Sequence, residues 1–339
     1  TVAGAPVGLL WANQATPLAE PVLFAAADFP IGMAVQTGRI KDGDPFQTGL
    51  VRHFNSVTCE NEMKPGLIHP QVNTYDWGPA DSTVTFAQNL GMSVHGHVLV
   101  WHEQIPSWMS NFSGSTAEWE AMLRSHIQAV VGHYKGKVSS WDVVNEAFLD
   151  DGSPRSTIWQ QNIPDYIAKA FTWAHEADPA AKLFYNDYNM EGLPAKRVAV
   201  LAAIADLKTR GIPVDGIGFQ AHVNLDWPTS ADFKAAVSAA AAMNLLIRFS
   251  ELDVSVNPNN TQSQLTDSLR IQQRARYKEI AEAYLTAPSA LRQGITLWGL
   301  RDPDSWILYV FNRQDWPCLF DDAYRAKPAF YGFWEGLMP

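Results

Sequence analysis

Polar side chains that can do chemistry recur where short apolar runs of this 339-residue sequence end. Glu146 directly follows the run Val138–Asn145, and Glu251 directly follows the run Leu245–Ser250. Two carboxyl groups on either side of a sugar-sized gap can cleave a glycosidic bond, because one protonates the leaving oxygen while the other attacks carbon or activates water. Asn145 adds an amide that suits a sugar hydroxyl beside the reacting carbon.

Other apolar runs break into reactive groups in the same way. The segments in question are Cys59–Lys64, His95–His102, Tyr185–Asn189, Gln220–His222 and Leu297–Gly299. In a barrel of parallel strands the carboxyl ends of all strands form one rim, and the active site lies there. A charged group that follows a buried strand is costly unless it has partners, so this many groups in register predict one shared pocket.

The elements that position these groups are short apolar runs that alternate with longer stretches of helical spacing. We predict strands at Ile31–Gln36, Phe54–Thr58, Ser93–Val100, Val138–Asn145, Lys182–Asn186, Gly216–Ala221, Leu245–Ser250 and Gly294–Trp298. Helices are predicted, for example, at Thr116–Tyr134, Pro164–Ala177, Ala195–Arg210, Ser230–Met243 and Thr266–Tyr284. Eight such units favour a single α/β domain, a (β/α)8 barrel over residues 1–339 with a lead-in segment at 1–27. Its fourth and seventh strands are expected to face each other, which brings Glu146 and Glu251 into one cavity.

Composition narrows the classes of protein. The net charge of -10 argues against nucleic acid and suits a neutral substrate. No apolar run approaches the roughly 20 residues that cross a bilayer. The two cysteines, Cys59 and Cys318, are expected to be free buried thiols. The chain opens at Thr1, from which we expect a processed N-terminus and a secreted, periplasmic or cell-surface location, with an intracellular one left open.

Two alternatives compete with a carboxylate-based hydrolase. The pair His95 and His97, with His222 and Asp253 available, permits a metal-dependent barrel hydrolase. That interpretation leaves the two glutamates and the thirteen tryptophans unexplained. A carbohydrate-binding protein without catalysis would use the tryptophans, because their rings stack on flat apolar faces. Such a protein would not need a pair of glutamates flanked by Asn145 and His222.

The sequence resembles glycoside hydrolase family 10 xylanases over nearly its whole length. The motifs that carry the resemblance are Trp141–Phe148, Phe249–Val254, Gly96–His102, Phe219–His222, Leu297–Gly299 and, near the ends, Ile31–Ala34 and Lys327–Phe330. The resemblance implies a retaining endo-β-1,4-xylanase without metal or cofactor, a monomer that acts on xylan or xylooligosaccharides and has no nucleic-acid or membrane partner. A β-1,4-glucanase of the same superfamily is the nearest alternative.

Residue roles follow from the matched motifs. The resemblance implies that Glu146 is the acid/base, that Glu251 is the nucleophile and that His222 is hydrogen-bonded to Glu251. The cleavage-point xylose would be lined by Asn145, His97, Trp101 and Gln220. The next sugar on the glycone side would be held by Glu60, Asn61, Lys64 and Gln104, and walled by Trp298 and Trp306. Tyr185 and Asn186, expected in the loop after the fifth strand, would lie on the aglycone side. The chain departs from many members at Pro65, where they have Trp, and at Ile307, where a polar residue is usual.

Overall fold

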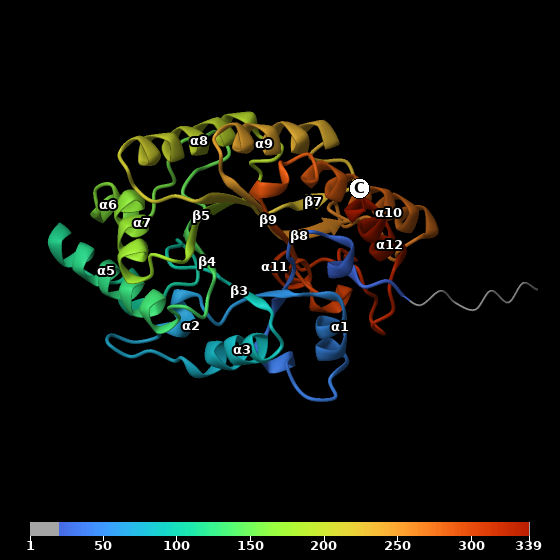
Figure 1. Ribbon diagram of the computed structural model, residues 1–339, viewed down its shortest axis with the longest axis horizontal. Coiled ribbons are helices and arrows are strands. Elements are labelled where there is room, and N and C mark those ends of the chain that lie inside the picture. Colours follow the sequence, from blue (N-terminus) through green and yellow to red (C-terminus); the bar gives the residue numbers. More distant parts are fainter. Residues whose placement is uncertain (1–19, 339) are drawn as a thin grey trace, which may run out of the picture.

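The structure, a computed structural model, describes residues 20–338, which form a closed barrel of parallel strands inside a ring of helices (Figure 1). The eight barrel strands are β1 Ile31–Val35, β2 Ser56–Cys59, β3 Ser93–Gly96, β4 Ser140–Asn145, β5 Lys182–Asp187, β6 Gly216–Phe219, β8 Leu246–Ser255 and β9 Arg292–Leu297. The barrel closes because β1 pairs with both β2 and β9, while β6 pairs directly with β8. The predicted (β/α)8 fold is confirmed. Residues 1–19 of the expected lead-in segment lie outside the described residues, and a single domain over residues 1–339 stays a prediction.

The largest differences from the predicted strands lie at two places on the rim. The third strand ends at Gly96 instead of Val100, although Val100 still makes an isolated bridge to Val144. The seventh strand continues from the predicted Ser250 to Ser255, because a short strand that the sequence did not predict, β7 His222–Asn224, pairs with its second half. The pairing register sets His222 beside Asp253. As a result, Glu251 and Asp253 lie within β8 and not in the loop after it.

The longer helices pack around the barrel and follow the strands in alternation. They are α1 Pro45–His53, α3 Gly78–Asn89, α5 Thr116–His133, α7 Tyr166–Ala177, α8 Pro194–Thr209, α9 Ser230–Ala242, α10 Asp267–Tyr284 and α12 Pro328–Leu337. Shorter elements lie in the loops: η1 Leu23–Ala26, η2 Thr37–Arg39, α2 Pro65–Ile68, α4 Ser107–Ser110, α6 Ile158–Asn162, η3 Ser289–Leu291, η4 Asp302–Asp304 and α11 Trp306–Val310. The five helices predicted from the sequence are present, with ends that differ by at most two residues.

Local capping explains why the helix starts were predictable. Ser115 and Thr229 each accept a hydrogen bond from the backbone N–H three residues later, and the acidic side chain at that position accepts one from the backbone N–H of the cap residue. These two capping boxes satisfy backbone donors that have no partner inside the helix. By contrast, α7 begins two residues later than predicted, since Asp165 takes a left-handed backbone conformation with φ of 58°.

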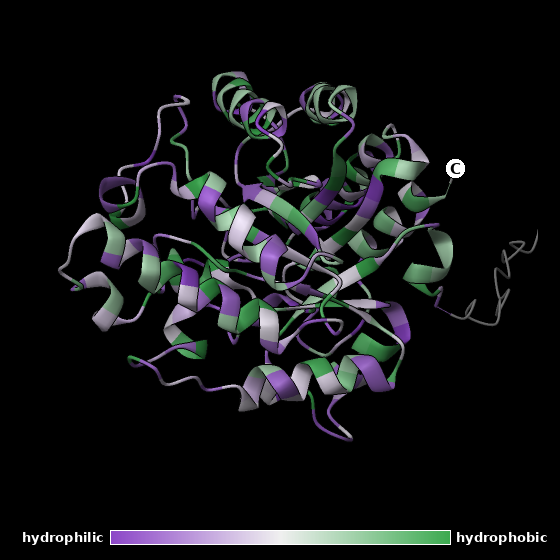
Figure 2. Ribbon diagram, turned by 60° about the vertical axis from the view of Figure 1, so that its left-hand side comes forward, coloured by the Kyte–Doolittle hydropathy of each residue, from purple (hydrophilic) through white to green (hydrophobic). Residues whose placement is uncertain are grey.

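The core combines the barrel interior with the layer between strands and helices. Outer helices carry both hydrophilic and hydrophobic residues, which allows one face of each to pack on the barrel (Figure 2). Close approach inside the barrel requires glycine at Gly96, because a Cβ there would lie 2.1 Å from the ring of buried Trp141. Cys59 and Cys318 are both buried and unpaired, as predicted. None of the helices in residues 20–338 is long and apolar enough to cross a membrane.

Candidate active site

A cleft of about 960 Å³ lies at the carboxyl ends of the strands. The predicted site residues that line it come from six of the eight barrel strands or the loops that follow them: Glu60, Asn61, Lys64, His97, Trp101, Gln104, Asn145, Glu146, Gln220, His222, Glu251, Trp298 and Trp306. The expectation of one shared pocket at the rim is therefore confirmed. Tyr185 and Asn186 are the two predicted site residues that do not line this cleft.

Glu146 and Glu251 come from strands that are three positions apart in the barrel order β4-β5-β6-β8. In a closed ring of eight strands this places them nearly opposite each other, and both glutamates line the same cleft, as expected. The two strands between them supply the side chains that connect the glutamates. Asn186 on β5 donates to Oε1 of Glu251 at 2.8 Å, and Gln220, after β6, donates to Oε1 of Glu146 at 2.9 Å.

Glu251 is buried and accepts hydrogen bonds at both carboxylate oxygens. Oε1 accepts from Asn186, and Oε2 lies 3.1 Å from Nε2 of His222. The other ring nitrogen of His222 lies 2.9 Å from Oδ2 of Asp253. Burial alone would lower the pKa of His222, but the charges and hydrogen bonds of Asp253 and Glu251 raise it to about 10. The ring is thus an imidazolium that donates to both carboxylates at neutral pH.

The same contacts act on the pKa of Glu251. Burial raises it, but the hydrogen bond from His222 and the electrostatic effects of His97 and His222 outweigh burial, so the pKa falls below its ordinary value. Asp253 is itself held by Trp306, whose Nε1 donates to Oδ2 at 2.8 Å. A chain of contacts therefore links the wall of the cleft to Glu251 and keeps its carboxylate ionised.

Glu146 has a different environment. Its Oε1 accepts from two neutral amides, Gln220 and Asn145. Its Oε2 makes no hydrogen bond to any of the described residues. The backbone at Glu146 is left-handed, with φ of 56°, and is held by its N–H donating to the carbonyl of Asn186 and by Arg155 Nε donating to its carbonyl at 2.8 Å. The carboxyl is thus aimed by its backbone and retains one oxygen for a ligand.

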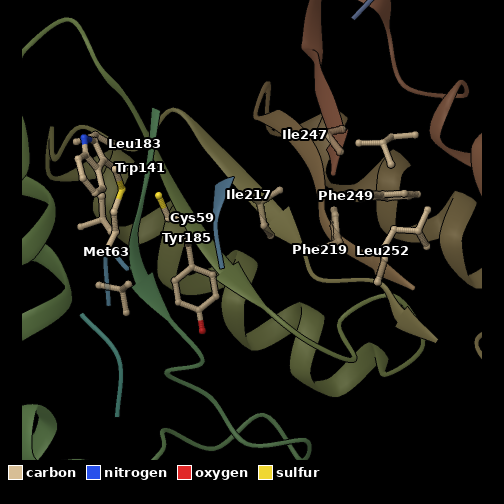
Figure 3. Packing of buried hydrophobic residues seen from close by; sticks show 14 of the residues in the cluster. Cys59, Met63, Trp141, Leu183, Tyr185, Ile217, Phe219, Ile247, Phe249 and Leu252 are labelled. Atoms are coloured by element: carbon tan, nitrogen blue, oxygen red, sulfur yellow. The ribbon is translucent and has the colours of Figure 1, made fainter. Parts of the chain in front are cut away.

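The placement of Tyr185 and Asn186 corrects the sequence prediction. Both lie inside β5 and not in the loop after it, and both are buried. Tyr185 packs in the hydrophobic cluster (Figure 3), donates to Asp187 at 2.6 Å and accepts from the backbone N–H of Ala147. Asn186, on the opposite face of the strand, points to Glu251 and accepts from Ser250. Gly218 leaves the room that Asn186 needs, because a Cβ there would lie 2.3 Å from its Oδ1.

The residues after β5 that reach the cleft are Tyr188 and Asn189. Tyr188 accepts a hydrogen bond from Arg155 at 2.7 Å, and the ammonium of buried Lys196 lies 3.5 Å from its ring centroid. Lys196 also pairs with Asp187 at 2.8 Å. Tyr188 and Asn189 belong to the predicted polar segment Tyr185–Asn189, but no role was predicted for them from the sequence. Arg155 lies in a loop with no motif around it, so no local signal pointed to it.

The histidines that suggested a metal site serve as partners of carboxylates. Nδ1 of His97 lies 2.9 Å from Oδ2 of Asp142, and Nε2 of His95 lies 3.0 Å from the other oxygen. Burial lowers the pKa of His95 to about 4, while the two histidines hold the pKa of buried Asp142 below its ordinary value against burial. In residues 20–338 no three His, Cys, Asp or Glu side chains gather in a way that could hold a metal ion.

Two further groups of residues line the cleft after β2. Glu60 accepts from Gln36 at 3.0 Å, and burial raises the pKa of Glu60. Lys64 donates to Asn61 at 3.1 Å, and its ammonium lies 5.2 Å from the ring centroid of Trp101. Burial lowers the pKa of Lys64, against the charges of Glu251, Glu60 and Glu146. These contacts fix several donors and acceptors beside an aromatic face, as a sugar ring requires.

A (β/α)8 barrel with two carboxyl groups connected by amides in a long rim cleft defines a glycoside hydrolase. The sequence profile described as glycosyl hydrolase family 10 matches residues 22–335, and the chain belongs to this family. It is 42% identical over 312 residues to a β-1,4-xylanase of Dictyoglomus thermophilum, covering 89% of this chain and 87% of that protein. It is 39% identical over 345 residues to the endo-β-1,4-xylanase Xyn10C of Cellvibrio japonicus, covering 93% of this chain but 57% of that longer protein. The crystal structure of xylanase 10B from Thermotoga petrophila in complex with xylobiose superposes with a TM-score of 0.88 at 37% identity, covering 94% of this chain and 97% of that one.

Proposed function

We propose that the protein is a retaining endo-β-1,4-xylanase in which Glu251 is the nucleophile and Glu146 the acid/base. The observation that carries the assignment is the unequal environment of the two carboxyl groups. Glu251 accepts hydrogen bonds at both oxygens, one of them from the imidazolium of His222, which favours the carboxylate. Glu146 accepts only from neutral amides, at one oxygen, and keeps the other for a proton and the glycosidic oxygen.

In the first step the carboxylate of Glu251 attacks the anomeric carbon while Glu146 gives its proton to the leaving sugar oxygen. The bond from carbon to that oxygen breaks, and a covalent glycosyl–enzyme forms with inversion. Asn145, next to Glu146 and held by Asn186, offers an amide to the hydroxyl beside the reacting carbon. A hydrogen bond to that hydroxyl strengthens as charge develops in the transition state.

In the second step the carboxylate of Glu146 takes a proton from water, and the water oxygen displaces Glu251. The second inversion restores the original configuration and returns both groups to their starting states. A spacing of about 5–5.5 Å between the two carboxyl groups is the retaining geometry, and it stays a prediction for this pair.

Xylan is the proposed substrate because the matched relatives are named xylanases and the cleft offers neutral hydrogen-bonding groups beside aromatic rings. We assign the cleavage-point sugar to His97, Trp101, Asn145 and Gln220. The next glycone sugar is assigned to Glu60, Asn61, Lys64 and Gln104, with Trp298 and Trp306 as walls. Tyr188 and Asn189 replace Tyr185 and Asn186 as the aglycone contacts after β5.

Product analysis tests the substrate. The protein is incubated in parallel with beechwood xylan, arabinoxylan, xylohexaose and carboxymethylcellulose. Short xylooligosaccharides released from the interior of xylan, with little attack on carboxymethylcellulose, are the expected result. Faster release of glucose oligomers from carboxymethylcellulose would establish the glucanase alternative.

We further propose that the protein acts as a monomer and that it is located outside the cytoplasm. A monomer suffices because both glutamates and the amides that hold them come from the same chain. A secreted, periplasmic or cell-surface location suits a polymeric substrate, since xylan does not cross a bilayer. Sizing of the purified protein by light scattering and assay of xylanase activity in fractionated cells check these two points.

A further inference from the structure

Three consecutive residues, Tyr309, Val310 and Phe311, expose large apolar side chains at 74%, 65% and 51%. Exposed apolar residues scattered singly over a surface are ordinary. Contiguous ones are uncommon and mark places where something binds. Among the described residues, the other large exposed apolar side chains are isolated from one another in sequence. This segment, here called the 309–311 ledge, is therefore unusual on this molecule.

The ledge borders the active cleft. All three residues line the same cleft as Glu251 and Trp306, and the first two lie on the short helix α11, which is drawn within the ring of outer helices (Figure 1). The side chain that anchors α11 is Ile307, which is 3% exposed. Because Ile307 already provides the buried contact, the exposed side chains of the ledge are not needed to hold the helix in place.

The rings of the ledge are held before any ligand arrives. The hydroxyl of Tyr309 donates to the carbonyl of Pro303 at 3.3 Å. The ring of Phe311 lies 5.4 Å from the ring of Trp306 and 4.7 Å from the guanidinium of Arg313. A surface whose side chains are already ordered loses less entropy when it binds.

The frame beneath Phe311 is also rigid. Arg313 donates to Asp315 at 3.2 Å and to Ser255 at 3.1 Å, at the end of β8. Buried Asp315 in turn accepts from the backbone N–H groups of Val256 and Asn257 at 2.9 and 3.2 Å. The loop that carries the ledge is thus fastened to the strand that carries Glu251.

We infer that the 309–311 ledge is an additional substrate-binding surface, on which the apolar face of a sugar ring lies. Aromatic rings present a flat apolar face with a polar edge, which matches the C–H face of a pyranose or furanose. Because the ledge is part of the same cleft, the sugar that binds there belongs to the same substrate molecule as the scissile bond. It is either a further xylose of the backbone or a branch sugar. The inference rests on the proposed xylanase function and adds a contact outside the sugars on either side of the scissile bond.

The test compares a long substrate with a short one. Tyr309→Ala, Phe311→Ala and the double variant are assayed on an aryl xylobioside, on linear xylohexaose and on arabinoxylan. The ratio of kcat/KM on the long substrates to that on the aryl xylobioside should fall about three- to tenfold, the loss that corresponds to one aromatic contact. A fall on linear xylohexaose identifies a backbone xylose, and a fall confined to arabinoxylan identifies a branch sugar.

Matched variants separate binding from folding. Tyr331→Ala removes an exposed aromatic ring from α12, outside the cleft, and should leave the ratio unchanged. Tyr309→Phe keeps the flat face and should retain most of the ratio, whereas Tyr309→Leu keeps apolar volume and should lose it. If the double variant keeps the wild-type ratio on every long substrate, the ledge does not bind a sugar ring. That result would leave the proposed xylanase function unaffected, because the wild-type protein would still hydrolyse xylan. A wild-type protein that does not cleave xylan would instead refute the proposed function.

Discussion

Asn186 donates its side-chain amide to Oε1 of Glu251 at 2.8 Å and to Oδ1 of Asn145 at 3.0 Å. One buried amide on β5 therefore connects the proposed nucleophile to the residue that precedes the proposed acid/base. The backbone carbonyl of Asn186 also accepts the N–H of Glu146 at 3.0 Å. The relative position of the two glutamates thus depends on the register of β5, and not only on the strands that carry them.

Replacing each glutamate separately tests the two roles. Glu251→Ala cannot form the glycosyl–enzyme, so activity should fall more than about 10⁴-fold even on an aryl xylobioside with a good leaving group. Glu146→Ala should lose about 10²–10⁴-fold on xylan but keep much of its first step on the activated substrate. Added azide should rescue Glu146→Ala with a β-xylosyl azide and Glu251→Ala with an α-azide. Azide products with the opposite configurations would exchange the two assignments.

His222→Gln tests the electrostatic support of Glu251. The imidazolium lowers the pKa of Glu251 against burial, so its removal should raise that pKa. The acid limb of the profile of kcat/KM against pH reports protonation of the nucleophile, and it should therefore move to higher pH. Activity at neutral pH should fall roughly tenfold or more, as expected for a lost charged hydrogen bond. His175→Asn, at an exposed position on α7, is the control and should keep the wild-type profile.

Glu191 predicts a pH dependence of stability. This buried carboxylate accepts the N–H of Ala221 at 2.8 Å, and burial raises its pKa from 4.5 to about 7 against its hydrogen bonds and the charge of His222. The folded state therefore holds the proton more tightly, and the free energy of unfolding falls as the pH rises from 4.5 through 7. In Glu191→Gln this loss, about 3 kcal/mol, should be absent. Urea unfolding at pH 5 and pH 8 measures it, with exposed Glu282→Gln as the control. A difference between variant and wild type that does not grow with pH would contradict the prediction.

Dialysis against EDTA should leave xylan hydrolysis essentially unchanged, because Glu146 and Glu251 already supply the acid and the nucleophile. Activity before dialysis, after dialysis and after the addition of zinc is compared on the same preparation. Loss of activity that zinc restores would return His95 and His97 to the role of metal ligands.

Tyr185→Phe should lower the stability of the protein, whereas Tyr188→Phe should weaken substrate binding. Tyr185 is buried and donates to Asp187, so removal of its hydroxyl should cost about 1–3 kcal/mol of stability with little change in KM. Tyr188 lines the cleft, so its variant should raise KM on xylohexaose at nearly unchanged melting temperature. A raised KM for Tyr185→Phe would favour the original sequence-based assignment over the correction.

The amino-acid sequence alone was enough to predict the barrel, the strand-end glutamates and the capped helix starts. These features depend on local pattern: apolar runs predict strands, and Ser115 with Glu118 or Thr229 with Asp232 predicts where a helix begins. His222, Gln220 and the rim tryptophans were also found, because they follow a strand directly or lie in the loop after it.

The folded structure was needed to show which face of a strand each side chain occupies and which distant groups are in contact. Successive residues of a strand point to opposite faces, so Tyr185 packs in the hydrophobic cluster whereas the neighbouring Asn186 reaches Glu251. The contact of Asp253 with His222 required the unpredicted strand β7, and that of Arg155 with Glu146 required a loop to fold back over the rim. Such contacts join residues that are far apart along the chain or lie in irregular loops, and local sequence patterns do not predict them.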